Sequence, residues 1–295
     1  MDFLKYRYIF LSISLSIIIV GFIYGFNSGF KFDIDFKGGT RIEADLKKDF
    51  TNEQIESIVK NITGSVPIVQ KVSSGVSSVS ITTDVITEEI SNKVVAALKT
   101  NYPNIDEPSI KNVQPAFGKE LIQSAILALV LSLFIILIYV AIRFKTLGTT
   151  AAVTAIIALF HDVLIIIALY GVFKFPINST FVAVILTVIG YSINDTIIVY
   201  DRIRENKRKV TKSANLKDTI NGSLNQTIKR TIYTSVTTIT AITVVYIFAY
   251  FNNQQVLKDF SLPLAIGILS GTYSSIFVAS SLWYIFEGFK KKKVR

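Results

Sequence analysis

The chain has 295 residues, of which 51% are hydrophobic and only 18% charged, and its formal net charge is +10. So large an apolar share excludes an ordinary cytosolic globular enzyme and indicates a membrane protein. The absence of cysteine and the single histidine exclude disulfides and thiolate nucleophiles and argue against a metal site, so we expect neither a catalytic centre nor a bound metal.

Apolar runs long enough to cross a membrane recur along the chain. A helix needs about 20 mostly apolar residues to span a hydrocarbon layer of roughly 30 Å. Runs free of charged residues, together with one run interrupted at His161-Asp162, predict six spanning helices over about 8–27, 120–142, 148–173, 177–200, 231–250 and 263–286. The first run is too long for a typical signal peptide and no small-residue cleavage site follows it, so we expect an uncleaved anchor.

Residues 28–118 have the character of a soluble domain. The runs FKFDIDF and TRIEADL predict two strands joined in a hairpin-like turn at Lys37-Gly38-Gly39. A capping box at Thr51 and Gln54 then opens a helix that ends near Ile62. Two strand-like runs follow, 66–72 and 76–83, with Ser-Ser-Gly between them.

A second helix is predicted from Thr87, with Glu88 and Glu89 in its first turn, to about Asn101, and a last strand over 109–115. After the opening hairpin the order is therefore β-α-β-β-α-β, which predicts a small ferredoxin-like α+β domain. We expect this domain to bind or clamp a partner rather than to catalyse a reaction.

The chain thus divides into an N-terminal segment with the first helix (1–27), the α+β domain (28–118) and a five-helix membrane region (119–295). The fold class is a polytopic α-helical membrane protein with one small α+β domain between its first two spanning helices. With a cytoplasmic N-terminus, the predicted cytoplasmic segments hold eighteen Lys and Arg against five acidic residues. The segment 28–119 holds eleven against twelve.

This asymmetry follows the positive-inside rule. It places both termini, the basic loop 201–230 and the basic C-terminal tail in the cytoplasm, and the α+β domain outside. Contact of the basic residues with anionic lipids also fits, and no nucleic-acid partner is needed to explain the net charge.

Ionisable groups within the predicted spans need a reason, because a charge at the bilayer centre costs about 2.5–3.5 kcal/mol on insertion scales. Asp195 lies in the cytoplasmic half of the fourth span, with Thr187 and Tyr191 eight and four residues before it and Asn194 beside it. Gly190 would let another helix approach this face closely. One interpretation is a protonatable carboxylate in a polar seam, and the other is a structural carboxylate or one that already lies at the level of the lipid headgroups.

Arg230 opens the fifth span, and Thr234 follows on the same helical face. Because both lie toward the cytoplasm, Arg230 and Asp195 can meet at similar depth, although Arg230 alone also fits an ordinary topology signal. In the third span, the neighbours His161 and Asp162 point about 100° apart and cannot share one face, so at least one should reach the interior. A proton path and a satisfied interhelical hydrogen bond explain that pair equally well.

The sixth span contains Gly267 and Gly271 at the spacing of a small-residue packing face. This pattern predicts a close helix contact.

Four motifs together resemble the SecF family of the bacterial Sec export machinery. They are FDIDFKGGT (32–40), IGYSINDTIIVYDRIREN (189–206), SLNQTIKRTIYTS (223–235) and GTYSSIFVAS (271–280). The resemblance covers the whole chain and implies a subunit of the bacterial cytoplasmic membrane, of the resistance–nodulation–division superfamily.

In that family the subunit pairs with SecD into a twelve-span unit, which works with the SecYEG channel and often with YajC. The unit uses the proton-motive force to assist the movement of preproteins across the membrane, without a bound cofactor. The family's proton-route residues fall on Asp195 and Arg230, and His161-Asp162 lies at a family-typical position.

Two other functions remain open from the residues. A proton-driven exporter of small molecules or lipids from the same superfamily would need the same proton site. A passive scaffold subunit with incidental membrane charges would show no proton-dependent phenotype.

Overall fold

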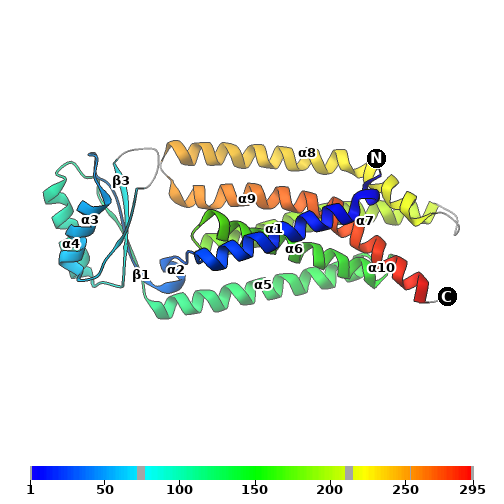
Figure 1. The fold of residues 1–295 in the computed structure, drawn as a ribbon, viewed down its shortest axis with the longest axis horizontal. Helices are drawn as coiled ribbons and strands as arrows, with labels where there is room; N and C mark the ends of the chain where they lie inside the picture. Colours follow the sequence, from blue (N-terminus) through cyan, green and yellow to red (C-terminus); the bar gives the residue numbers. More distant parts are fainter. Residues whose placement is uncertain (1, 72–76, 210–214, 253, 294–295) are drawn as a thin grey trace.

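The computed structural model describes residues 2–71, 77–209, 215–252 and 254–293. Figure 1 shows an elongated molecule, with long helices bundled along its length and a small sheet domain at one end. Both chain termini lie at the opposite end of the bundle (Figure 1). In the described ranges, six helices are long and apolar enough to cross a membrane: Phe3–Ser28, Pro115–Arg143, Thr149–Phe173, Ser179–Lys209, Leu216–Phe251 and Gln255–Phe289.

The six predicted spans are therefore confirmed as helices. The first consists of a 3-10 turn (Phe3–Tyr6) and α1 (Arg7–Ser28). The next four are α5 (Pro115–Arg143), α6 (Thr149–Phe173), α7 (Ser179–Lys209) and α8 (Leu216–Phe251). The sixth is α9 (Gln255–Tyr273), a π-helical segment (Ser274–Ala279) and α10 (Ser280–Lys293).

The predicted cytoplasmic loop 201–230 is largely helical, which corrects the sequence-based boundaries. Residues 201–209 continue α7 and residues 216–230 begin α8, while 210–214 lie outside the described residues. Ile203, Ile220 and Leu224 are fully or almost fully buried. They give these charged helix ends an apolar stripe that packs on the bundle, a feature that a search for charge-free runs does not detect.

The centre of the bundle is formed by α6, α7 and the sixth span, and α1, α5 and α8 are mostly exposed within this chain. Glycines set the closest approaches. A Cβ atom added at Gly267 would come 2.4 Å from Val188 of α7, and one at Gly271 would come 2.9 Å from Ser192. The pair predicted as a packing face thus lies where α9 meets α7.

The sheet domain consists of β1 (Gly39–Asp45), α3 (Asn52–Thr63), β2 (Ile68–Lys71), β3 (Ser78–Thr83), α4 (Glu88–Asn101) and β4 (Ser109–Val113). The predicted β-α-β-β-α-β order is observed, with the strands arranged β2-β3-β1-β4 and all neighbours antiparallel. The capping box at Thr51 is present, and Thr87 caps α4. The predicted Ser-Ser-Gly turn lies outside the described residues.

Apolar side chains on one sheet face pack against α3 and α4 and form a core of their own, which includes Ile42, Ile55, Ile81, Val94 and Leu98. The two helices lie on the side of the sheet away from the bundle (Figure 1). The opposite sheet face is therefore turned toward the ends of the membrane helices.

The predicted opening hairpin is wrong. Residues 34–37 form a short helix, α2 (Ile34–Lys37), whose first backbone N–H is capped by the Asp33 carboxylate. The backbone before it pairs with Ile177, which donates to Lys31 O at 2.8 Å and accepts from Asp33 N at 3.1 Å. Because this partner lies 140 residues away in the chain, the alternating pattern of the segment could not reveal it.

Candidate functional site

Asp195 lies within α7 and is only 1% exposed. Neither of its carboxylate oxygens accepts a hydrogen bond from the part of the chain that the structure describes. An unpartnered carboxylate charge away from water costs several kcal/mol. The group is therefore stabilised there either by taking up a proton or by the approach of a positive charge.

Arg230, the predicted partner, lies on α8 and is exposed within this chain. Its charge acts on Asp195 electrostatically, but the described side chains include no ion pair or hydrogen bond between the two. A guanidinium side chain is long and flexible enough to reach a neighbouring carboxylate when helices shift. The structure thus brings the two residues near one another without joining them.

Hydroxyl groups link α7 to α8 and α9 one turn from Asp195. The Tyr191 hydroxyl donates to Ser235 and Thr238 at 3.5 Å each. Ser235 in turn lies 2.6 Å from the Thr272 hydroxyl of α9. The first two contacts are at the distance limit of a hydrogen bond, so the seam can separate at small cost.

The other residues predicted to line the polar seam lie elsewhere. Thr187 and Asn194 are exposed, and a Cβ atom added at Gly190 would have nothing within 4 Å, so the expected close helix approach is absent within this chain. Eight residues rotate a helix about 80° beyond two full turns, which is enough to carry Thr187 away from the face of Asp195. Thr234 donates to the carbonyls of its own helix, at Arg230 and Thr231.

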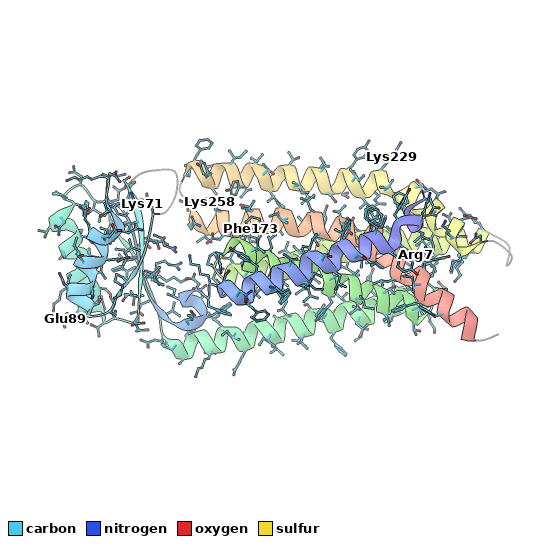
Figure 2. The ribbon with its side chains drawn as sticks, in the orientation of Figure 1. Arg7, Lys71, Glu89, Phe173, Lys229 and Lys258 are labelled. Atoms are coloured by element: carbon cyan, nitrogen blue, oxygen red, sulfur yellow. The ribbon has the colours of Figure 1, made fainter. Side chains whose placement is uncertain are left out.

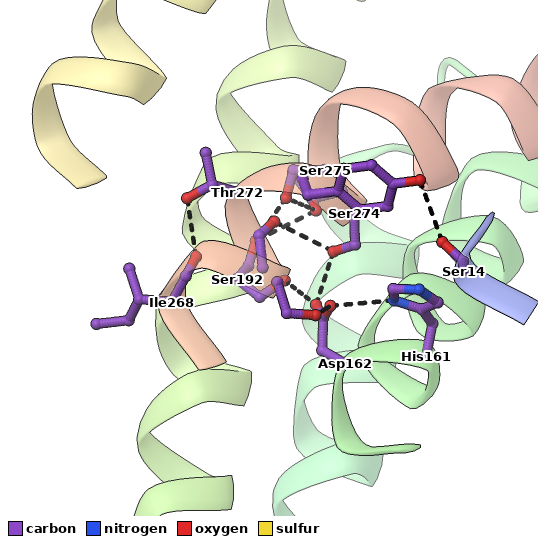
Figure 3. A network of polar contacts seen from close by, with 12 residues as sticks. Ser14, His161, Asp162, Ser192, Ile268, Thr272, Ser274 and Ser275 are labelled. Carbon is purple, nitrogen blue, oxygen red and sulfur yellow. Dashed lines mark hydrogen bonds and ion pairs between the residues drawn. The ribbon is translucent and has the colours of Figure 1, made fainter. Parts of the chain in front are cut away.

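Asp162 of α6 is fully buried at the centre of a polar cluster (Figure 3). Three serine hydroxyls donate to its carboxylate: Ser192 at 2.6 Å, Ser274 at 2.7 Å and Ser270 at 2.8 Å. They come from α7, the π-helical segment and α9. Asp162 therefore holds three elements of the bundle together.

His161 lies beside this cluster, with its Nδ1 3.2 Å from Asp162 Oδ1. Its ring stacks on Tyr273, whose hydroxyl donates to Phe10 O of α1 at 2.7 Å. Both members of the pair are buried, which meets the expectation that at least one of them reaches the interior. The reason is that α6 is surrounded by other helices on most of its sides, so adjacent residues both point into protein.

Sequence reasoning missed the π-helical segment at Ser274–Ala279. The wider π turn directs Ser274 to Asp162 and Ser275 to Thr196, at 2.7 Å and 2.9 Å. Single π turns inside α-helices are frequent at functional sites. The run Thr272-Tyr273-Ser274-Ser275 is the sequence feature at this position, with four consecutive hydroxyl-bearing residues where α9 ends.

The two buried aspartates thus have opposite surroundings. Both oxygens of the Asp162 carboxylate accept hydrogen bonds, whereas those of Asp195 accept none from the residues that the structure describes. A carboxylate that is fully hydrogen-bonded favours its charged form, while one without donors is sensitive to a proton or a moving cation. The described residues contain no group of His, Asp and Glu that could hold a metal ion.

Comparisons with known proteins agree with one another. The family "Protein export membrane protein SecD/SecF, C-terminal" matches residues 93–288, which include Asp162, Asp195 and Arg230. The "Protein translocase subunit SecF" of Sebaldella termitidis is 34% identical over 98% of this chain and 92% of its own length. That of Haemophilus influenzae is 37% identical over 96% of this chain and 85% of its own.

Longer proteins of the same kind also match. The "Protein translocase subunit SecDF" of Bacillus subtilis is 34% identical over 98% of this chain, which covers 38% of that protein. The crystal structure of SecDF from Thermus thermophilus, a translocon-associated membrane protein, superposes with a TM-score of 0.84 at 30% identity, over 98% of this chain and 39% of that one.

Proposed function

Because the chain belongs to the SecD/SecF family of protein export membrane proteins, we propose that it is the SecF subunit of a SecDF complex. The complex uses the proton-motive force to assist protein translocation across the bacterial cytoplasmic membrane, together with the SecYEG channel. The subunit is not an enzyme and needs no bound cofactor, since the proton is the coupling ion.

The observation that carries the proposal is the buried, unpartnered carboxyl group of Asp195. One proton that crosses the membrane releases about 2.3 kcal/mol per 100 mV. Inserting a charge at the bilayer centre costs about 2.5–3.5 kcal/mol on insertion scales. Because the two energies are of similar size, protonation of Asp195 can decide between two arrangements of the bundle.

The moving parts follow from the contacts around this residue. When Asp195 is charged, it attracts Arg230 of α8, and when it takes a proton this attraction is lost. The weak hydroxyl seam of Tyr191 then lets α7 and α8 separate. The His161-Asp162 pair belongs to the same relay, with the Asp162 carboxylate hydrogen-bonded to three serine hydroxyls.

The orientation of the subunit follows from its charge and its shape. The basic ends of α7 and α8 lie near the chain termini, at the end of the bundle away from the sheet (Figure 1). By the positive-inside rule that end is cytoplasmic, and the ferredoxin-like domain is extracytoplasmic. The domain then meets preproteins on the outer face of the membrane.

The exposed surface of the bundle supports a membrane partner. Thr187 and Asn194 on α7, with Arg230 and Thr237 on α8, are polar yet exposed within this chain. Polar side chains at membrane depth are unfavourable against lipid and favour an interhelical contact. SecD supplies the covering helices, and YajC and the channel join the assembly outside them.

A translocation assay tests the proposal directly. Vesicles that contain the complex with Asp195→Asn are expected to lose stimulation of preprotein export by a proton gradient, because the amide cannot take up the proton. Copurification of SecD should be unchanged. Asp218→Asn, which removes an exposed carboxylate near the start of α8, is the matched control and should keep full stimulation. Full stimulation with Asp195→Asn would refute the assignment.

A further inference from the structure

The segment that joins α1 to β1 is held at the outer ends of two membrane helices. Its backbone pairs with Ile177, two residues before α7 begins. On its other side α2 touches the start of α5, where a Cβ atom added at Gly118 would come 2.7 Å from Phe36 O. The short helix α2 thus lies between the first turns of α5 and α7.

One side chain of α2 joins the sheet to α7. Asp35 Oδ2 accepts from the backbone N–H of Ser179 at 3.0 Å and from its hydroxyl at 2.7 Å. Asp35 Oδ1 accepts from Lys111 Nζ at 2.7 Å. Ser179 is the first residue of α7 and Lys111 lies on β4, so a single carboxylate connects α2, α7 and the sheet.

The surroundings of Asp35 stabilise its contacts with Ser179 and Lys111. A carboxylate at a helix N-terminus is stabilised by the unpaired N–H groups and by the helix dipole. Asp35 is only 4% exposed, and its hydrogen bonds are charge-assisted. Burial by itself would raise the pKa of Asp35, but the hydrogen bonds from Lys111 and Ser179 outweigh it and hold the pKa below the ordinary 3.8. The carboxylate therefore stays charged at physiological pH.

Where the sheet faces the start of α9, the contact between the two is looser than at Asp35. A cavity of about 130 Å³ separates the polar sheet face from the end of α9, lined by charged and polar groups that include Lys31, Arg41, Glu43, Gln70 and Asp259. Figure 2 shows Lys71 on the sheet side of this junction and Lys258 on the bundle side. Polar interfaces between domains permit relative motion. The sheet is joined to α5 through Gln114, directly after β4, and the Asp35 contacts join it to α7.

The neighbouring Asp33 provides a contrast within the same segment. It is also buried, but its carboxylate caps α2 and pairs with Arg41 of β1. Its two partners are the backbone of α2 and the strand β1, and neither of them is on α7. The Asp33 side chain therefore stabilises the domain without linking it to a membrane helix.

We propose that Asp35 is the positioning residue through which α7 moves the extracytoplasmic domain. Asp195 lies sixteen residues further along α7, about 24 Å at 1.5 Å per residue. The helix between them is continuous and contains no proline, so α7 can carry a displacement from Asp195 to Ser179. The inference rests on the proposed function, since it identifies how a proton event at Asp195 reaches the domain that acts outside the membrane.

Distance measurements between spin labels test the link in the full complex reconstituted in lipid. The chain has no cysteine, so Ser57→Cys on α3 and Phe173→Cys at the outer end of α6 give one specific pair of labels, both at exposed positions. We expect a narrow distance distribution in the parent protein, which carries the two labelled cysteines and no other change. Asp35→Asn should broaden and shift it, because the ion pair with Lys111 and the charge at the α7 N-terminus are lost.

Lys111→Gln breaks the same link from its half-exposed end and serves as a second variant that spares the buried carboxylate. Asp33→Asn is the control, because asparagine still caps α2 and the link to α7 stays intact. Stimulation of export by a proton gradient is measured on the same samples. We expect its loss in Asp35→Asn and Lys111→Gln and its retention in Asp33→Asn.

An unchanged distance distribution in both link variants would overturn the inference, and so would full stimulation in a variant whose distribution is broadened. A parent complex without any stimulation would contradict the proposed function instead. In that case the distance distributions alone decide whether Asp35 holds the domain to α7.

Discussion

The two buried aspartates of the bundle show how environment separates residues of the same type. Asp162 sits among three serine hydroxyls, and Asp195 has no donor among the described residues. Asp162 therefore links the helices through hydrogen bonds, whereas the proposed function assigns the response to a proton to Asp195. This difference follows from which neighbours supply hydroxyls and not from the depth of either residue in the membrane.

Removal of the Asp162 carboxylate is expected to weaken the bundle. Asp162→Ala leaves three buried hydroxyl donors without their acceptor and opens a cavity between α6, α7 and the sixth span. We expect a loss of at least about 2 kcal/mol of stability, seen as a lower thermal unfolding midpoint of the purified protein in detergent. Asp218→Ala, the same change at an exposed position, should shift the midpoint little. Equal midpoints for both variants would show that the cluster does not hold the helices together.

For single residues, the sequence predicted which side chains matter better than it predicted which way those side chains point. Asp195 is buried among neighbouring helices, as the interpretation of a carboxylate in an interhelical seam requires. Thr187, Gly190 and Asn194 are exposed within this chain, so their place in a polar seam stays a prediction that depends on a partner helix. Asp35 was passed over as one member of an alternating strand pattern, because its partner Ser179 lies far away in the chain.

Among the secondary-structure elements, the long helices were predictable and their junctions were not. Apolar length alone specifies a spanning helix, since the bilayer requires every backbone group to be paired within it. The helical ends of α7 and α8, the short helix α2 and the π-helical segment all depend on tertiary contacts. Ile203 and Ile220 extend α7 and α8 through packing, and the backbone of residues 31–33 pairs with Ile177 instead of forming a hairpin.

The close packing of α9 on α7 is a prediction at the scale of elements. Gly267→Ala places a methyl group 2.4 Å from Val188 Cγ2, so the two helices must separate or Val188 must leave its rotamer. Overpacking of this kind costs about 1–3 kcal/mol. We expect a lower thermal unfolding midpoint for the purified chain.

Gly222→Ala on α8 is the matched control, because a Cβ atom there meets nothing within 4 Å. Alanine favours a helix over glycine by about 1 kcal/mol, so this variant should unfold at the same or a higher temperature. If Gly267→Ala behaves like Gly222→Ala, α9 and α7 are not packed as closely as the structure shows.

On the scale of the whole molecule, the bundle contains a carboxyl group without a hydrogen-bond partner among the described residues, and the sheet domain lies at its far end. The long α7 extends from one to the other (Figure 1). A rigid helix of this length turns a local change of charge into a displacement at its end, where Asp35 receives it. If Asp195 exchanges a proton, this arrangement can move the sheet domain outside the membrane without energy from a nucleotide.

Infrared difference spectroscopy of the intact complex measures that exchange. The spectrum at acidic pH minus that at alkaline pH should contain the C=O stretch of a protonated carboxyl group, which disappears in Asp195→Asn and remains in Asp218→Asn. A band of unchanged intensity in Asp195→Asn would show that the titrating group lies elsewhere, and it would contradict the assignment of proton coupling to α7.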